Sequence, residues 1–233
     1  MGSFGHLSTF SFYPAHQITT GEGGAVLTSN PLLYKIARSF RDWGRDCWCP
    51  TGKDNTCGKR FSWKLGKLPL GYDHKYIYSE AGFNLKMTDI QAAIGLAQMD
   101  KLEDFVKRRR ENFAYLQKRF TEEKIDSQFV MPKETCGAEA CWFGFPLTIK
   151  NDKIDRTKLM ERLNAAGVGT RFVFGGNITK QPYFITNKVP HRISGSLVNT
   201  DIIMNRAFWI GVYPALEKEH LDYAVNQMKS ALL

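Results

Sequence analysis

Three cysteines lie close together in one glycine- and lysine-containing stretch of the sequence, Cys47, Cys49 and Cys57. Thiolates are soft ligands that bind zinc or the iron of an iron–sulfur cluster. Either group usually takes four protein ligands, so a fourth ligand is missing from this stretch. Cys136, Cys141, a histidine or a residue outside the chain could supply it. The spacing C-x-C is a poor zinc knuckle, which favours iron–sulfur over zinc and leaves unligated thiols as the third possibility.

A histidine, His16, lies between two predicted strands at residues 7–13 and 24–28, shortly before the glycine-rich sequence TTGEGG. Glycine permits sharp turns and close approach of the backbone to a ligand. Side chains on such loops carry out chemistry more often than side chains in cores. From these residues alone, the plainer interpretation is a solvated or core-satisfied histidine.

Composition limits the classes of partner. The 233 residues include 32 Lys and Arg against 23 Asp and Glu, a formal net charge of +9. A basic balance suits nucleic acid, anionic membranes or phosphorylated small molecules. The charges are dispersed, and the densest basic run, residues 107–110, fits a solvated helix face better than a nucleic-acid site. With no membrane-length apolar run and no visible secretory signal, we expect a cytoplasmic protein without nucleic-acid or membrane partners.

The elements that position these residues follow from local signals. Thr88 and Gln91 form a capping box that opens a helix through about residue 102. Residues 45–82 have no clear periodicity, which is typical of a functional insertion or a mobile loop. Helices are predicted at residues 31–43, 105–123, 156–166, 200–209 and 217–232, and strands at residues 142–149 and 168–174. This alternation predicts a small α/β domain from about residue 115 onward.

Two stretches carry a resemblance to a known family. Residues 10–26, FSFxPxHxITTGEGGAV, resemble the cofactor-lysine segment of the DegT/DnrJ/EryC1/StrS sugar aminotransferases, and residues 82–93, GFNLKMTDIQAA, resemble a second hallmark of that family. Its members are fold-type-I enzymes that use pyridoxal 5′-phosphate (PLP). The resemblance implies an α/β, PLP-dependent-transferase-like fold. Residues 1–114 would be the latter part of the large cofactor-binding domain, with an iron–sulfur loop at residues 45–82, and residues 115–233 the small C-terminal domain.

One departure from the family pattern narrows the function. Most members have lysine where this chain has His16. With this histidine and the three-cysteine loop, the sequence is similar to one branch of the family. Enzymes of that branch dehydrate nucleotide-linked 4-keto-6-deoxyhexoses at C3 in lipopolysaccharide and O-antigen biosynthesis. The resemblance implies pyridoxamine 5′-phosphate (PMP), a [2Fe-2S] cluster and CDP-4-keto-6-deoxyglucose as substrate. It also implies that His16 is the base and that a flavin- and NADH-dependent iron–sulfur reductase supplies electrons.

Further site residues are implied by the same resemblance. Ser11 matches the family's phosphate-binding serine, and Asn84 matches an asparagine that reaches the phosphate across the interface of a homodimer. Tyr13 is a candidate to assist His16 at the sugar or cofactor. Arg171 and Lys180 are candidates for the nucleotide diphosphate. The structural alternatives are a strand-packed serine, a turn asparagine, a packing tyrosine and two solvated charges.

Family members are close to twice as long as this chain. The portion that would precede it carries the aspartate that pairs with the pyridinium nitrogen and, a short way upstream of Met1, the cluster's first cysteine. We therefore expect an incomplete fragment that is unstable and inactive in isolation. Two rival hypotheses are an inactive remnant and a PLP-dependent nucleotide-sugar aminotransferase. The second is disfavoured by the absence of lysine at position 16 and by the cysteine loop.

Overall fold

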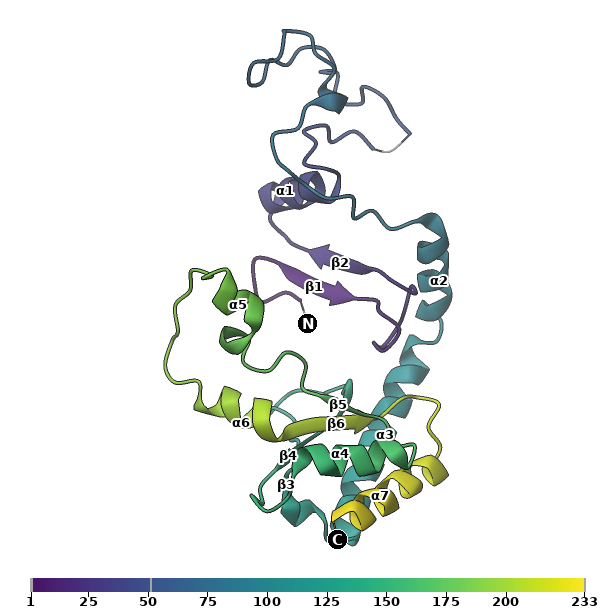
Figure 1. Ribbon diagram of the computed structural model, residues 1–233. Coiled ribbons are helices and arrows are strands. Elements are labelled where there is room, and N and C mark those ends of the chain that lie inside the picture. Colours follow the sequence, from purple (N-terminus) through teal and green to yellow (C-terminus); the bar gives the residue numbers. More distant parts are fainter. Residues whose placement is uncertain (1, 51, 233) are drawn as a thin grey trace. The chain divides into compact units, whose positions relative to one another are not determined.

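The computed structural model describes residues 2–50 and 52–232 of the chain. It divides between Asp100 and Lys101 into two compact units, called here the N-terminal unit and the C-terminal unit (Figure 1). The division falls in the turn between α2 (Asp89–Met99) and α3 (Leu102–Glu122). The domain boundary expected from the sequence, between residues 114 and 115, lies inside α3.

The N-terminal unit begins with a two-stranded antiparallel sheet, β1 (Ser8–Ser11) and β2 (Gly24–Leu27), as the sequence predicted. The two strands pair with Ser11 opposite Gly24. A Cβ atom at position 24 would lie 2.6 Å from the carbonyl oxygen of Phe10, so this pairing requires glycine. The loop between the strands carries His16, and the hairpin therefore fixes where that side chain can lie.

Two capped helices and one irregular stretch complete this unit. In α1 (Pro31–Arg41), the Asn30 side chain accepts hydrogen bonds from the second and third helical N–H groups. The capping box of Thr88 and Gln91 opens α2 as predicted, and the Gln91 amide also donates to the Glu22 carbonyl, 2.8 Å away. Between the helices, the described residues form the 3-10 turn η1 (His74–Tyr76) and otherwise irregular backbone, in agreement with the absence of periodicity.

The C-terminal unit contains an antiparallel sheet in the order β3-β4-β6-β5 (Figure 1). Its strands are β3 (Phe129–Val130), β4 (Gly144–Ile149), β5 (Thr170–Phe172) and β6 (Ala207–Gly211). Its further helices are α4 (Arg156–Ala165), α5 (Pro182–Thr186), α6 (Val198–Arg206) and α7 (Lys218–Leu232), with short 3-10 turns η2 (Asp126–Gln128) and η3 (Ile178–Lys180). The apolar core lies between this sheet and α3, α4 and α7, and includes Phe120, Phe145 and Phe208.

The predicted helix over residues 200–209 is wrong at its end. α6 stops at Arg206, and the next residues form β6, which pairs with both β4 and β5. Phe208 and Ile210 are buried in the core, whereas Trp209 between them is half-buried and donates its indole N–H to the Phe172 carbonyl. This alternation with period two fits a strand, and pairing on both sides outweighs the local helical pattern.

The basic run at residues 107–110 is more than a solvated helix face. That interpretation is wrong for Arg109, which is 2% exposed and donates from its guanidinium to the Phe143 carbonyl, 3.2 Å away. Burial lowers the pKa of Arg109. Arg108 donates to the carbonyls of Pro214 and Leu216 and thereby ties α3 to the loop before α7.

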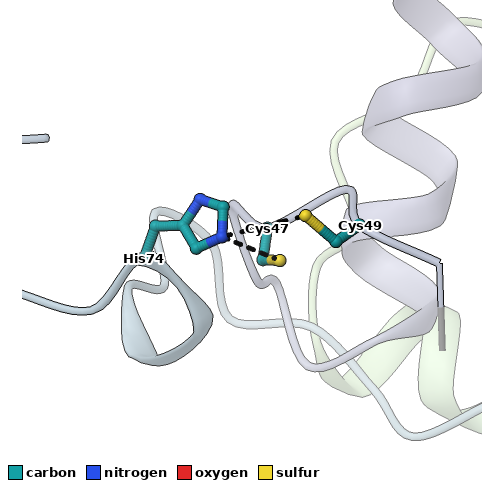
Figure 2. A group of neighbouring side chains, drawn as sticks. All are labelled: Cys47, Cys49 and His74. Atoms are coloured by element: carbon teal, nitrogen blue, oxygen red, sulfur yellow. Dashed lines mark hydrogen bonds between the residues drawn. The ribbon is translucent and has the colours of Figure 1, made fainter. Parts of the chain in front are cut away.

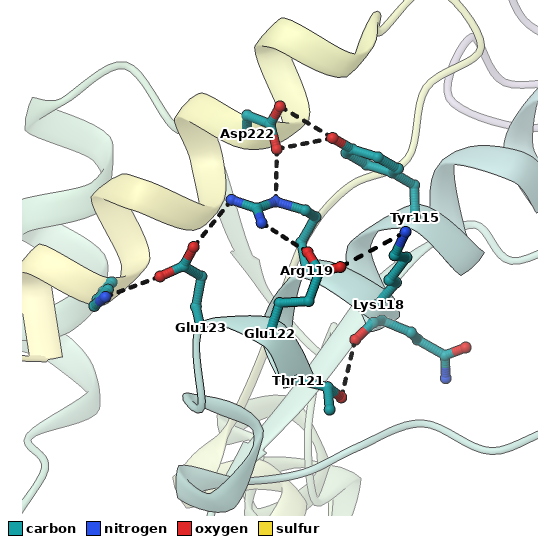
Figure 3. Close-up of polar contacts among 9 residues, drawn as sticks. Tyr115, Lys118, Arg119, Thr121, Glu122, Glu123 and Asp222 are labelled. Carbon is teal, nitrogen blue, oxygen red and sulfur yellow. Dashed lines mark hydrogen bonds and ion pairs between the residues drawn. The ribbon is translucent and has the colours of Figure 1, made fainter.

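A polar network joins α3 to α7 on the surface of the C-terminal unit (Figure 3). Arg119 donates to Asp222 and to Glu122, each at 2.7 Å, and to Glu123 at 3.1 Å. Tyr115 donates its hydroxyl to Asp222. Burial, and to a smaller extent the Asp222 carboxylate, raises the pKa of Tyr115. The network aligns the two helices over the core. Among the described residues, no helix has the length and apolar character needed to cross a membrane.

Candidate functional site

The irregular stretch of the N-terminal unit gathers three thiols around one imidazole, a group called here the Cys–His cluster. Its members are Cys47, Cys49, Cys57 and His74. The Nε2 atom of His74 lies 3.3 Å from the sulfur of Cys47, 4.0 Å from that of Cys49 and 3.9 Å from that of Cys57. The ligand atoms of Cys47, Cys49 and His74 all lie within 4.8 Å of one another (Figure 2). The side chain of His74 is completely buried.

The backbone before Cys47 is shaped by a glycine. Gly44 has φ +79°, and a Cβ atom there would overlap the carbonyl oxygen of Glu80. The close approach lets the strand-like segments 44–46 and 77–80 run side by side, with the Asp46 N–H donating to the Ile77 carbonyl at 3.0 Å. Cys47 is thereby brought beside the turn that contains His74.

An ion pair brings Cys57 to the same turn. The guanidinium of Arg60 donates to one carboxylate oxygen of Asp73 through two nitrogens, at 2.8 and 3.0 Å, and lowers the pKa of Asp73. The His74 N–H in turn donates to the Arg60 carbonyl, 3.0 Å away. The Asp73 side chain also accepts from the N–H of Lys75 and caps η1. Segment 57–60 and segment 73–75 are therefore held together by charge-assisted hydrogen bonds.

Two indole rings form an aromatic wall around the imidazole. The ring centroids of Trp48 and Trp63 lie 5.0 Å apart, and that of Trp63 lies 5.1 Å from the ring of His74 in an edge-on arrangement. These rings contribute to the surroundings of any bound metal group, and such surroundings control its potential. A cavity of about 340 Å³ reaches Cys47 and Trp48 from the side of α1 and is also lined by Lys35 and Arg38.

The thiols differ in acidity. A hydrogen bond to Thr56 lowers the pKa of Cys49 to about 6, so this thiol is largely ionised at neutral pH. Burial raises the pKa of Cys47. A metal ion binds thiolates and neutral imidazole, and binding therefore releases the protons that remain. Three sulfurs and one imidazole form a soft donor set that fits iron or zinc.

Sequence reasoning named the three cysteines but not His74. No spacing rule marks a histidine that lies 17 residues after Cys57. The available signal was the presence of a histidine in the same aperiodic stretch, next to an aspartate that can pair with Arg60. Cys136 and Cys141, the other candidates for a fourth ligand, belong to the C-terminal unit.

The proposed base and two neighbouring candidates share one turn. His16 is half-buried, and its backbone N–H donates to the Tyr13 carbonyl at 3.0 Å. The Tyr13 N–H donates to the hydroxyl oxygen of Ser11 at 3.2 Å. The side chains of Ser11 and Tyr13 are exposed. The turn after β1 thus presents a hydroxyl, a phenol and an imidazole close together in the chain.

The remaining candidates lie elsewhere. Asn84 is exposed and pairs through its backbone with Asp42, just after α1. Lys180 forms an ion pair with Asp201 at 2.9 Å, and Arg171 donates to the Thr170 carbonyl in β5. Both basic residues belong to the C-terminal unit, so their assignment to a nucleotide diphosphate stays a prediction.

The chain belongs to the DegT/DnrJ/EryC1/StrS aminotransferase family, whose sequence profile matches residues 1–229. It is 52% identical over 98% of its length to the lipopolysaccharide biosynthesis protein RfbH of Salmonella typhimurium. It is 47% identical over 97% of its length to a dTDP-4-dehydro-2,6-dideoxy-D-glucose 3-dehydratase of Saccharopolyspora spinosa. The family expected from the two sequence motifs is confirmed.

Solved structures show the same fold. The E. coli GDP-4-keto-6-deoxy-D-mannose-3-dehydratase with bound hydrated PLP superposes with a TM-score of 0.77 at 26% identity, over 98% of this chain and 55% of that one. The α/β fold of PLP-dependent enzymes is therefore confirmed. The chain spans about half the length of the relatives it matches, namely 52% of the Salmonella protein and 48% of the Saccharopolyspora protein.

Proposed function

We propose that the chain is part of an enzyme that removes the C3 hydroxyl of a nucleotide-linked 4-keto-6-deoxyhexose, with CDP-4-keto-6-deoxyglucose as the substrate. The feature that carries the proposal is an imidazole, His16, in the segment that resembles the family's cofactor-lysine segment. Imidazole cannot form a Schiff base with PLP, so ordinary transamination is disfavoured. Two relatives of the chain are 3-dehydratases of nucleotide-linked sugars, which supports the same reaction class.

The donors on the hairpin fit a phosphate-bearing cofactor without covalent attachment. PMP, when bound, supplies an amine that condenses with the sugar's keto group and a ring that accepts electrons from an adjacent C–H bond. His16 accepts the released proton on an imidazole nitrogen, a role that histidine side chains perform in many enzymes. Ser11 donates its hydroxyl to the phosphate, and Tyr13 positions the reacting groups. Asn84 donates its amide to the phosphate bound by the second subunit of a homodimer.

Electrons are needed because the dehydrated sugar adduct must be reduced to give the deoxygenated product. We assign Cys47, Cys49 and Cys57 as three ligands of a [2Fe-2S] cluster that relays them from a flavin- and NADH-dependent reductase. The cavity that reaches Cys47 from the side of α1 has Lys35 and Arg38 in its lining. This cavity suits entry of electrons from a protein donor.

Deuterium exchange tests the role of His16. The family-length protein that contains this chain is incubated in D2O with PMP and CDP-4-keto-6-deoxyglucose, and the methylene carbon of PMP is analysed by mass spectrometry. Sugar-dependent deuterium incorporation is expected, and a His16→Asn variant should lose it by a factor of about 10²–10⁴, the usual contribution of an acid–base group. His6→Asn, a change at an exposed histidine of the same unit, is the matched control. Equal exchange in His16→Asn and wild type would contradict the proposal.

A further inference from the structure

The burial of His74 is not accounted for by the proposed function. Of the five histidines, all of which lie in the described part of the chain, it is the only buried one, with 0% of its surface exposed. Its main chain is satisfied elsewhere, because its N–H donates to Arg60 and its carbonyl accepts from Ile77. A buried imidazole without polar partners is costly, so its ring nitrogens need contacts of their own.

Sulfur supplies those contacts. The hydrogen bonds described for the ring all go to thiol sulfurs, and the contact of Nε2 with Cys47 at 3.3 Å is the shortest. The sulfur of Cys57 lies 3.8 Å from Nδ1 and 3.9 Å from Nε2, so it faces both nitrogens of the ring. A neutral imidazole carries one N–H, which can donate a hydrogen bond to one thiolate. The sulfurs of the other two cysteines lie near the same ring.

We propose that His74 donates an imidazole N–H to the sulfur of Cys47 and thereby raises the reduction potential of the cluster that Cys47, Cys49 and Cys57 ligate. This inference rests on the proposed function, because it presupposes that cluster. Reduction adds negative charge to the cluster, and a hydrogen bond to a ligand sulfur stabilises that charge. The imidazole of His74 is completely buried and packs against Trp63, and a buried site strengthens the electrostatic effect of the bond.

Direct ligation of iron by His74 is the alternative to hydrogen-bond donation, and the test below separates the two. When histidine replaces cysteine on a [2Fe-2S] cluster in Rieske centres, two histidines ligate one iron. The described chain offers one buried imidazole next to the three sulfurs. Ligation would place the Nε2 lone pair on iron and remove this nitrogen as a donor. Substitution of a ligand should cause loss of the cluster, whereas substitution of a hydrogen-bond donor should leave the cluster bound and change its reduction potential.

The test compares His74→Leu, which removes the N–H, with His74→Gln, whose amide retains one. Iron and sulfide are quantified in the purified, reconstituted protein, and the cluster is titrated electrochemically with electron paramagnetic resonance as the readout. Both variants are expected to retain the cluster. The potential should shift to a more negative value in His74→Leu and shift less in His74→Gln, whereas His6→Leu leaves it unchanged. A purely structural role for His74 would not produce this graded shift.

Three results would overturn the inference. An unchanged potential in His74→Leu with full cluster content would show that the hydrogen bond has no effect. Loss of the cluster in His74→Leu with recovery in His74→Cys would identify His74 as a ligand of the cluster. Loss of the cluster in all variants of His74 would identify a structural role for this residue. A wild-type protein without iron and sulfide would defeat the proposed function itself. That result is distinguishable because it is seen before any variant is made.

Discussion

The two units of the molecule are held together by different interactions. In the described part of the N-terminal unit, Ile77 is the only hydrophobic residue that is buried, alongside the polar Thr20 and His74. Every other buried hydrophobic side chain belongs to the C-terminal unit, where eighteen residues from Phe113 to Met228 form one core. Among the described residues, hydrogen bonds, ion pairs and backbone turns therefore connect the segments of the unit that carries the candidate chemistry, whereas apolar burial connects those of the other unit.

This difference has an energetic consequence. Burial of apolar surface is the main favourable contribution to folding, so the C-terminal unit has its own source of stability. The N-terminal unit exposes large apolar side chains such as Phe4, Leu70 and Ile90. Because metal binding contributes directly to folding where a site is not otherwise held, a group bound by the Cys–His cluster would stabilise the N-terminal unit selectively.

The largest expected effect is on metal content. Cys47→Ser removes a soft ligand from the Cys–His cluster and should abolish nearly all bound iron after reconstitution. Cys136→Ser, at an exposed cysteine of the C-terminal unit, is the matched control and should leave the iron content unchanged. Elemental analysis of both purified variants gives the comparison. Equal iron in the two would place the metal site elsewhere.

The next largest effect is on global stability. Phe145 is completely buried in the core, so Phe145→Ala should lower the free energy of unfolding by about 3–5 kcal/mol. Phe4 is 98% exposed, and Phe4→Ala should change it by no more than about 0.5 kcal/mol. Urea unfolding followed by circular dichroism measures both. A comparable loss in Phe4→Ala would show that the N-terminal unit has apolar packing of its own.

Matched helix caps sharpen the comparison at a smaller scale. Thr88 caps α2 and Asp155 caps α4, each through a side-chain oxygen that accepts a backbone N–H. Replacement of either by alanine should cost about 1 kcal/mol locally. Only Asp155→Ala should lower the midpoint of cooperative urea unfolding, while Thr88→Ala should speed amide hydrogen exchange within α2. Equal shifts of the midpoint would mean that the two units unfold together.

The smallest effect concerns pH. The guanidinium of Arg60 holds the pKa of Asp73 below its usual range. A carboxyl whose pKa is depressed on folding adds stability above its unfolded pKa of about 3.9, and this stability is lost as the pH falls through the lower folded pKa. Protection of the His74 amide, corrected for intrinsic exchange, should therefore weaken on acidification below about pH 4. In Asp73→Asn this pH dependence should disappear, and its persistence would assign it to another group.

Local signals allowed much of the fold to be predicted from the sequence. The cap at Thr88, the glycine-rich turn before Gly24 and the aperiodic stretch at residues 45–82 depend on neighbouring residues, and the structure has all three. The end of α6 could not be predicted in this way. Residues 207–209 form a strand because β4 and β5 pair with them, and both partners are distant in the sequence.

The candidate site shows the same limit. Residue type and spacing identified Cys47, Cys49 and Cys57, because thiols in one short stretch are informative by themselves. The position of His74 depends on the ion pair of Arg60 with Asp73, which brings together two segments that share no spacing pattern. A contact that depends on an ion pair between two other residues leaves no periodic signal in the sequence. The imidazole of His74 was therefore found only in the structure.

If the N-terminal unit is organised around an iron–sulfur centre, the metal and sulfide content of the protein must show it. The family-length protein that contains this chain is purified without oxygen, reconstituted with iron and sulfide, and assayed for iron, zinc and inorganic sulfide. It is then reduced and examined by electron paramagnetic resonance. We predict iron and sulfide in equal amounts and the signal of a reduced [2Fe-2S] cluster. Zinc without sulfide, or no bound metal, would contradict the account.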